Sequence, residues 1–321
     1  MSKLFGIDLG GTKIEGVVLD LEKEARIIFR ERIPTERDQG YEHILNQIAR
    51  MAEMMEKAAG EKATAIGIGT PGDTDPKTGL LRNSNTLCLN DQPLHRALEE
   101  RLGEKMEMAN DANCFALAEY HMGAVQLAYP QARVAFGVIM GTGVGGGLVF
   151  DGQLWPGHHG IAGEWGHNFL DASGGSCYCG RSGCVESVLS GPSLEAFYRS
   201  MSGGKHLPLS EIISIGKTRT EGAEAATLHR LIHFFGKALG PVINLLDPDV
   251  IVLGGGLGNI DLLYTRGREE VSGYLFNNRM DTILIPPALG DSAGVFGAAL
   301  LVADEGQLAK LRAEAGNLTS S

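Results

Sequence analysis

The 321-residue sequence lacks any dense cluster of lysine and arginine, and its 39 acidic residues against 28 basic ones leave a formal net charge of −11. Phosphate contacts dominate the binding of nucleic acids, so this composition argues against DNA or RNA as the main partner. A phosphorylated small molecule is still compatible with it, because backbone N–H groups can bind phosphate without basic side chains.

The sequence also lacks a long apolar run, since no stretch approaches the roughly 20 residues that a membrane-spanning helix needs. The first residues, MSKLFGIDLGG, lead directly into a strand-like segment and carry neither the apolar core nor the cleavage site of a signal peptide. The five cysteines show no paired pattern, which is typical of a reducing compartment. We therefore expect a cytoplasmic protein without a membrane partner.

Glycine is abundant, with 45 residues that cluster at particular turns between short apolar strands and helix-like segments. Mixed strands and helices of this kind predict an α/β fold. The expected strands are 4–9, 14–19, 26–33, 64–69, 106–109, 133–140, 146–150, 250–253 and 282–285, and the expected helices are 41–59, 93–102, 111–122, 194–201, 223–246, 260–276 and 293–304.

Two segments repeat one pattern, an apolar strand, a glycine-rich turn, a second apolar strand and an aspartate. They are FGIDLGGTKIEGVVLD at 5–20 and FGVIMGTGVGGGLVFD at 136–151. Such turns can direct N–H groups and a threonine hydroxyl, here Thr12 and Thr142, toward a phosphate, although glycine is equally useful in an ordinary hairpin. Asp8 is placed to hold Mg²⁺ or to orient phosphates. Because the pattern occurs twice, we favour a nucleotide-phosphate clamp and two related α/β halves.

Other glycine motifs are misleading matches. Residues 67–72 and 141–146 both fit GxGxxG, but a loop and a strand follow them, whereas a dinucleotide site requires a helix. Residues 6–13, GIDLGGTK, nearly fit a P-loop, but the last pair is reversed and a strand follows. A third cluster at 253–258 is as compatible with a strand-to-helix turn as with a surface for adenine or ribose.

The segment 162–186 brings together one histidine and three cysteines, His167, Cys177, Cys179 and Cys184. This is the ligand set of a closed tetrahedral zinc site, which we favour over a disulfide or over buried free thiols. A structural zinc would fix the glycine- and serine-rich loop, and with it two carboxylates, Glu164 and Glu186, that could grip a polyhydroxylated ligand.

Asn110-Asp111 lies between a short apolar strand and a helix, where a carboxylate is commonly only an N-cap. Beside a phosphate clamp and a carbohydrate-gripping loop, Asp111 becomes the best candidate for a general base that accepts the proton of an attacking hydroxyl.

An ordered set of motifs resembles the ROK family of bacterial sugar kinases and sugar-responsive repressors. The set is DLGGTK (8–13), GTPG (69–72), ND (110–111), GTGVGGG (141–147), AGEWGH (162–167), CYCGRSGCVE (177–186), VLGGG (252–256) and GDSAGVFGAA (290–299). The resemblance covers nearly the whole chain. It implies a two-domain, actin-like, ribonuclease-H-like α/β fold with the active site in the interdomain cleft. The implied domains are a small one at 1–118 with 300–321 and a large one at 119–299 that contains the zinc loop 164–186.

The resemblance also implies ATP with Mg²⁺, one structural Zn²⁺ per chain, a homodimer and specific roles for individual residues. Asp111 resembles the catalytic base. The implied substrate-binding residues are Asn110, Asp111, Glu164, His167, Glu186, Gly72 and Asn85; the implied nucleotide-binding residues are Asp8, Gly10, Gly11, Thr12, Lys13, Thr142, Gly143, Gly255 and Gly256; and the implied zinc ligands are His167, Cys177, Cys179 and Cys184.

The substrate expected from the resemblance is a free hexose, phosphorylated on its 6-hydroxyl. Residues 82–94 and the motifs at 110–114 and 162–170 are most similar to fructokinases and mannokinases of the family, which predicts fructose or mannose and allows glucose. N-acetylglucosamine kinases share NDANCFAL and GTGVGGGL, so an N-acetylglucosamine or N-acetylmannosamine kinase is the alternative. Cys88 stands where the family often has tryptophan. A repressor is disfavoured because the first glycine loop begins at Asp8, and the remaining alternative is a sugar sensor without catalysis.

Overall fold

The computed structural model describes residues 2–318 and confirms the α/β prediction. The chain divides into two compact units. Unit 1 comprises residues 1–137, 147–163 and 287–321, and unit 2 comprises 138–146 and 164–286. The predicted domain boundaries, 1–118 with 300–321 and 119–299, stay a prediction.

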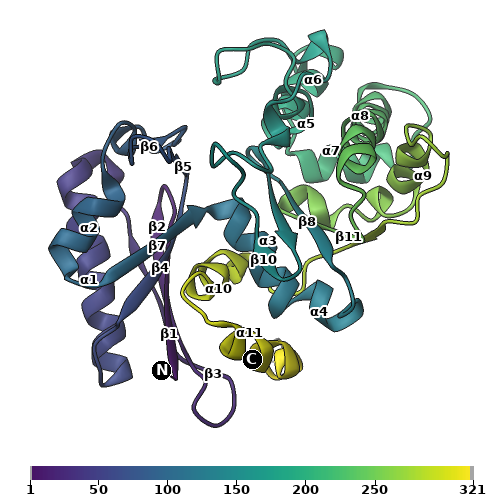
Figure 1. The fold of residues 1–321 in the computed structure, drawn as a ribbon. Helices are drawn as coiled ribbons and strands as arrows, with labels where there is room; N and C mark the ends of the chain where they lie inside the picture. Colours follow the sequence, from purple (N-terminus) through teal and green to yellow (C-terminus); the bar gives the residue numbers. More distant parts are fainter. Residues whose placement is uncertain (1, 319–321) are drawn as a thin grey trace. The chain divides into compact units, whose positions relative to one another are not determined.

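The sheet of unit 1 has five strands in the order β3-β2-β1-β4-β7 (Figure 1). These are β1 (Lys3–Leu9), β2 (Lys13–Asp20), β3 (Arg26–Pro34), β4 (Ala65–Thr70) and β7 (Lys105–Asn110). The first three strands are antiparallel, whereas β1, β4 and β7 run parallel. Parallel strands end at the same edge, so Asp8 lies opposite Gly69, and Thr70 opposite Asn110.

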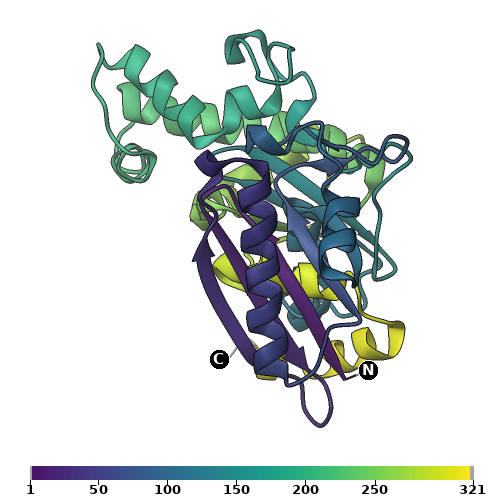
Figure 2. The same ribbon diagram turned by 90° about the vertical axis from the view of Figure 1, so that its left-hand side faces the viewer.

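One face of this sheet carries large apolar side chains. Ile7 on β1 and Ile68 on β4 are fully buried against α1 (Tyr41–Ala59) and α2 (Leu94–Leu102), together with Ile48 and Met51 of α1. Figure 2 shows α1 lying lengthwise across this face. Since side chains alternate along a strand, the residues next to Ile7 and Ile68 point to the opposite face.

Glycines occupy that opposite face, which α3 (Asp111–His121) and α10 (Ala293–Leu300) cover. A Cβ atom on Gly67 would lie 1.8 Å from the carbonyl oxygen of Ala298, and one on Gly6 would lie 2.4 Å from the amide nitrogen of Ala299. A Cβ atom on Gly297 of α10 would lie 1.8 Å from the carbonyl oxygen of Cys114. The strands and both helices are therefore in contact at the level of their backbones.

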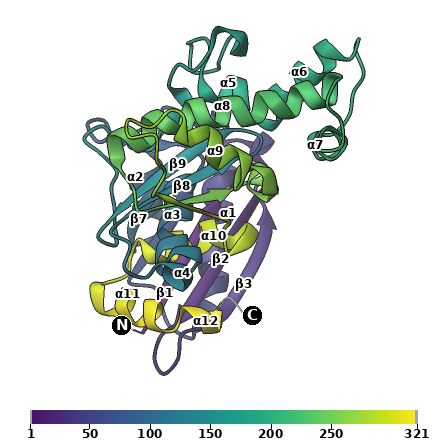
Figure 3. The ribbon, with the colours of Figure 1, turned by 90° about the vertical axis from the view of Figure 1, so that its right-hand side faces the viewer.

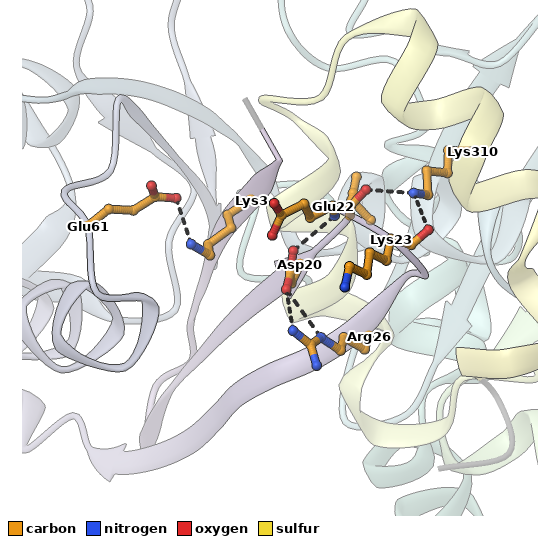
Figure 4. A network of polar contacts seen from close by, with 8 residues as sticks. Lys3, Asp20, Glu22, Lys23, Arg26, Glu61 and Lys310 are labelled. Atoms are coloured by element: carbon orange, nitrogen blue, oxygen red, sulfur yellow. Dashed lines mark hydrogen bonds and ion pairs between the residues drawn. The ribbon is translucent and has the colours of Figure 1, made fainter.

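Unit 1 is completed by short elements. These are β5 (Asp73–Thr74), β6 (Leu81–Arg82), β10 (Gln153–Leu154), α4 (Ala124–Ala128), α11 (Glu305–Ala313) and α12 (Ala315–Leu318). Asp304 begins α11 with a capping box to Gln307. Lys310 then donates to the carbonyl oxygens of Leu21 and Lys23 in the β2–β3 turn, at 2.6 and 2.7 Å (Figure 4).

Two buried ionisable residues of α3 hold the returning chain in unit 1. The Glu119 carboxylate accepts hydrogen bonds from the backbone N–H groups of Ala124, Ala288 and Leu289. The Nε2 of His121 lies 2.7 Å from the carbonyl oxygen of Gly152, and its Nδ1 lies 3.1 Å from Nη1 of Arg312. Because the guanidinium can only donate, the imidazole is neutral, with its proton on Nε2.

The second sheet has the order β10-β9-β8-β11-β12. Its longer strands are β8 (Val134–Met140), β9 (Val144–Phe150), β11 (Val250–Gly254) and β12 (Ile283–Ile285), and both β8 and β9 contain residues of each unit. Unit 2 also contains α5 (Val185–Leu189), α6 (Gly191–Met201), α7 (Leu209–Gly216), α8 (Ala223–Leu246) and α9 (Arg266–Ser272). The long α8 packs against the other four (Figure 3). Among the described residues, every helix is too short or too polar to span a bilayer.

Two predictions about helices were wrong. The helix expected at 260–276 is interrupted, because Thr265 has φ −111° and ψ −85°, so that only a 3-10 turn and α9 form. The helix expected at 293–304 ends at Leu300, and α11 begins anew at its own cap. The short helices α4, α5, α7, α11 and α12 were not predicted.

The glycine contact of β4 with α10 generates a stability prediction. We expect Gly67→Ala to lower the free energy of unfolding by about 3 kcal/mol or more, because its methyl group would meet backbone that cannot yield. Gly306→Ala is the control, since in α11 the nearest atom to such a methyl group is Asp304 Oδ1 at 3.3 Å. Urea unfolding of both variants measures the difference, and equal stabilities would contradict the packing described.

His121 generates a prediction about acid stability. Burial lowers its pKa to about 4 in the folded protein, against about 6.5 when unfolded. Between these values the unfolded chain binds a proton that the folded chain does not. The free energy of unfolding should therefore fall as the pH drops from about 6.5 to about 4, by up to about 3 kcal/mol from this residue.

The measurement is urea unfolding of the wild type and of His121→Gln at pH 7 and at pH 4.5. The wild type should lose more stability than the variant over this interval. An equal loss in both proteins would show that His121 does not cause it.

Candidate functional site

The first predicted phosphate turn joins β1 to β2 in unit 1. The amide of Gly10 donates to the carbonyl oxygen of Lys13 at 2.9 Å, which closes the turn over Gly11 and Thr12. Thr35, directly after β3, donates through Oγ1 to the carbonyl oxygen of Gly10 at 2.7 Å. Gly11 and Thr12 remain accessible to solvent, as a ligand-binding turn requires.

Asp8 lies just before this turn, on the glycine-bearing face of the sheet. Cβ atoms on Gly69 and on Gly294 would each lie 3.3 Å from the Asp8 carboxylate. Because glycine has no side chain, these two positions leave room for the carboxylate. Burial raises the pKa of Asp8 to about 7, with Asp111 and Glu15 adding to the effect and Lys13 opposing it. Asp8 and Asp111 are thus close enough to influence each other.

Asn110, rather than Asp111, is the N-cap of α3, which corrects the expectation for Asp111. The Oδ1 of Asn110 accepts from the amides of Ala112 and Asn113, at 2.8 and 3.2 Å. Its Nδ2 is the atom that could donate to a substrate hydroxyl. Asp111 is the first helical residue, and its Oδ1 accepts from Ala112 N at 2.7 Å.

The Asp111 side chain is exposed to solvent, although surrounding protein atoms raise its pKa above the ordinary value. Because water reaches the carboxylate directly, we expect an ionised group at neutral pH. An ionised, accessible carboxylate is the state that a general base needs.

Gly72 and Asn85, the other substrate candidates of unit 1, lie in the loops after β4 and β6. A Cβ atom on Gly72 would lie 2.4 Å from the carbonyl oxygen of Arg82, so the close approach of two backbones already requires glycine there. Asn85 is exposed, beside Thr86. A separate polar cavity of about 230 Å³ borders Asn110 and is lined by Thr70, Asp73, Thr74, Glu107 and Asn113, among others.

The second predicted phosphate turn lies in unit 2, where Gly141 N donates to the carbonyl oxygen of Gly143 at 2.9 Å. A cavity of about 760 Å³ opens beside it. Gly141, Thr142 and Gly256 line this cavity, and a Cβ atom on Gly256 would meet no other atom within 4 Å. Gly255 has a different reason to be glycine, because its φ is +75° and a Cβ atom would lie 2.3 Å from Met140 O.

Three substrate candidates of unit 2 gather around Val144. Oε2 of Glu186 accepts from Val144 N at 2.9 Å. The turn that contains Glu164 and His167 is anchored to the same strand, since Trp165 Nε1 donates to Gly145 O at 2.9 Å. Oε2 of Glu164 lies 3.8 Å from Nε2 of His167. The second glycine turn and all three polar residues are therefore held in place by the start of β9.

The predicted zinc ligands converge. His167, Cys177, Cys179 and Cys184 offer ligand atoms that all lie within 4.8 Å of one another. Cys177 Sγ is 3.6 Å from His167 Nδ1, and Cys179 Sγ is 3.6 Å from Cys184 Sγ. Bond lengths of about 2.3 Å for Zn–S and about 2.05 Å for Zn–N give tetrahedral edges of about 3.5 to 3.8 Å. The donor set and its spacing therefore fit zinc.

The second nitrogen of His167 is held as well. With Nδ1 facing the cysteines, Nε2 lies 3.1 Å from Tyr178 Oη, in addition to its approach to Glu164. Such contacts orient a metal-ligating imidazole and select its tautomer. If His167 binds zinc through Nδ1, its Nε2 side is the side available to a substrate.

The sequence matches the ROK family model over residues 4–305. The N-acetyl-D-glucosamine kinase of Histophilus somni is 36% identical over 308 residues, which cover 92% of this chain and 98% of that protein. The enzyme of the same name from Haemophilus influenzae is 36% identical over 312 residues, with the same coverages.

The chain belongs to the ROK family. Two solved structures agree with this assignment. The ROK hexokinase of Thermus thermophilus has a TM-score of 0.81 and 32% identity, covering 93% of this chain and 97% of that one. A ROK glucokinase of Streptomyces griseus, solved with glucose and AMPPNP, has a TM-score of 0.72 and 27% identity, covering 93% and 98%. The two-domain actin-like fold that the motifs predicted is confirmed.

Several residues at the ROK candidate sites were missed by the sequence analysis. Glu195, Lys217 and Asn259 line the large cavity of unit 2. Glu195 and Lys217 come from α6 and from the end of α7, which carry no recognisable motif, whereas Asn259 directly follows the glycine cluster at 253–258. Arg37 was missed for a similar reason, although it lies over the first glycine turn. Such residues are identified only by their proximity to a recognised motif in the folded structure.

The cysteine cluster generates a prediction about metal content. We expect about one zinc per chain in protein purified without added metal, measured by elemental analysis. Cys179→Ser should release most of this zinc and lower Tm by about 5 °C or more, because zinc stabilises the folded loop. Cys88→Ser, which alters a thiol outside the cluster, is the control. Full zinc content in Cys179→Ser, with unchanged Tm, would contradict a structural site.

Proposed function

We propose that this chain is an N-acetylglucosamine kinase that transfers the γ-phosphoryl group of MgATP to the 6-hydroxyl of the sugar. The observation that carries this proposal is the identity of 36% to N-acetyl-D-glucosamine kinases over almost their full length. The chain is an ATP-dependent sugar kinase, which agrees with these relatives and with the ROK hexokinase and glucokinase.

The expected preference for fructose or mannose is not supported by these relatives. It depended on the short segments 82–94, 110–114 and 162–170, whereas the comparison with N-acetylglucosamine kinases covers 92% of the chain. A free hexose remains the second candidate, because the ROK hexokinase of Thermus thermophilus combines 32% identity with a TM-score of 0.81.

Asp111 is the residue that we propose as the general base. The reaction needs a carboxylate that accepts the proton of the 6-hydroxyl while the oxygen attacks the γ-phosphorus of ATP and ADP leaves. Asp111 is accessible and fixed at the start of a helix, with Asn110 held beside it by its capping bonds. Asn110 Nδ2, Glu164, His167 and Glu186 are proposed to bind sugar hydroxyls, and Gly72 and Asn85 to line the sugar site.

The two glycine turns are proposed to bind the phosphates, through Gly10, Gly11, Thr12, Thr142 and Gly143, with Lys13 adding charge. The 760 Å³ cavity bordered by Thr142 and Gly256 has the size for an adenosine group. Mg²⁺ would neutralise phosphate charge, and Asp8, which lies before the first turn, is its proposed ligand, direct or through water. The cleft location, the structural zinc, the homodimer and the cytoplasmic location stay predictions.

A panel of sugars tests the proposal. N-acetylglucosamine, N-acetylmannosamine, glucose, mannose and fructose are compared by kcat/KM in an ADP-release assay. We expect N-acetylglucosamine to exceed the others by about tenfold or more, since a site that pairs with an amide discriminates against sugars that lack it. A higher kcat/KM for fructose, mannose or glucose would instead identify a hexokinase. Sugar binding without ADP release from any sugar would indicate a sensor.

Asp111→Asn serves as the catalytic control in the same assay. Its kcat should fall by about 10²- to 10⁴-fold, because an amide cannot accept the proton, while the affinity for the sugar measured by calorimetry stays within about threefold. Near-normal turnover would remove Asp111 from the role of base.

A further inference from the structure

Arg37 lies over the first glycine turn of unit 1. A Cβ atom on Gly11 would lie 3.2 Å from Nη1 of Arg37, 3.4 Å from Oγ1 of Thr86 and 3.9 Å from Oδ1 of Asn85. The space directly above the Gly11 backbone is thus bordered by a guanidinium, a hydroxyl and an amide. This is a set of hydrogen-bonding groups suited to a phosphate.

The backbone that carries Arg37 is bound to the same turn. Thr35 donates through its N–H to Thr12 O at 3.0 Å and through Oγ1 to Gly10 O at 2.7 Å. Two hydrogen bonds therefore join the segment that carries Arg37 to the glycine turn.

Glu36 turns the chain so that Arg37 points back over the glycines. Its φ of +50° and ψ of +45° place it in the left-handed region, which is uncommon for a residue with a side chain. Oε2 of Glu36 lies 2.8 Å from Nε2 of His43, which holds the Glu36 side chain toward α1. On the other side, the thiol of Cys88 lies 3.8 Å from the carbonyl oxygen of Arg37. Unfavourable backbone angles kept by surrounding contacts are a known feature of functional sites.

The Arg37 guanidinium has no carboxylate partner among residues 2–318, and its side chain is exposed. Two other arginines nearby differ in this respect, since Arg30 and Arg32 both donate to the buried carboxylate of Glu15. In a chain with a net charge of −11, an unpaired arginine beside a phosphate turn is available for an anionic ligand.

We propose that Arg37 is a catalytic residue that binds the phosphoryl group during its transfer from ATP to the sugar. This inference rests on the proposed function, because it assigns a contact to the group that a kinase transfers. A guanidinium can donate two parallel N–H bonds to phosphoryl oxygens, and its charge stabilises the negative charge that those oxygens carry in the transition state. Thr86 and Asn85 border the same space.

The test compares Arg37→Ala and Arg37→Lys with Arg50→Ala, an exposed arginine on α1 that serves as the matched control. With the preferred sugar and MgATP, kcat of Arg37→Ala should fall by about 10²- to 10³-fold, while the KM of the sugar changes by less than about threefold. Arg37→Lys should retain intermediate activity, and added guanidinium ion should partly restore Arg37→Ala.

A second readout does not depend on turnover. MgADP alone should raise the Tm of the wild type and of Arg37→Ala equally. Addition of aluminium fluoride, which with MgADP mimics the transferring phosphoryl group, should raise Tm further in the wild type and in Arg50→Ala but not in Arg37→Ala.

The outcomes separate the two proposals. Absence of ADP release from wild type and Arg50→Ala with every sugar would overturn the proposed function and the role of Arg37 with it. Normal activity of the wild type, with Arg37→Ala within about threefold of Arg50→Ala in kcat, would overturn the role of Arg37 alone. An effect on sugar KM only, or an equal response to aluminium fluoride in all variants, would also overturn it.

Discussion

Direct backbone contact between the sheet of unit 1 and α10 determines the position of the groups around the first glycine turn. Gly6 and Gly67 have no side chains to separate their strands from Ala298 and Ala299 of the helix, and Gly297 lets α10 touch α3 in the same way. The carboxylate of Asp8 occupies the small space between Gly69 and Gly294 that this contact leaves. The high pKa of Asp8 is a consequence, because burial in that space disfavours its charged form.

Hydrogen bonds to buried charged or polar groups complete the same assembly. The Glu119 carboxylate accepts hydrogen bonds from the amides of Ala288 and Leu289, where the chain re-enters unit 1. The Nδ1 of His121 accepts a hydrogen bond from Arg312 of α11. Glu15 on β2 binds Ser292, immediately before α10. Each of these contacts joins residues more than 150 positions apart, so the discontinuous unit depends on a few polar pairs as well as on its apolar core.

The sequence alone predicted the parts of the fold in which local pattern and tertiary structure agree. The strands on both sides of each glycine turn, and the long helices α1 and α8, follow directly from apolar periodicity. The interruption at Thr265 could not be predicted, because it depends on the backbone angles of one residue and not on a proline or a change of polarity. The N-cap of α3 was assigned to Asp111 because asparagine and aspartate are both favourable N-cap residues, and only the structure shows that Asn110 is the cap.

The candidate site likewise contains some residues that the sequence predicted and others that only the structure identifies. The proposed zinc ligands are close in sequence, so their spacing alone predicted the cluster, and the structure brings all four side chains together. Asp8, Asp111 and both glycine turns were found through motifs. Arg37 and the cavity residue Lys217 were not found from the sequence. Their positions depend on the tertiary course of the backbone, and an isolated basic residue is not part of a recognisable motif.

The discontinuity of unit 1 has a consequence for the order in which the protein is made. Residues 1–163 are synthesised before α10. Until α10 has been made, the glycine-lined face of the sheet is exposed to water, and the Glu119 carboxylate lacks the hydrogen bonds from the amides of Ala288 and Leu289. Unit 2 is complete once residue 286 has emerged, and it can fold first. The half that carries Asp111 therefore matures last, after translation has reached the final helices.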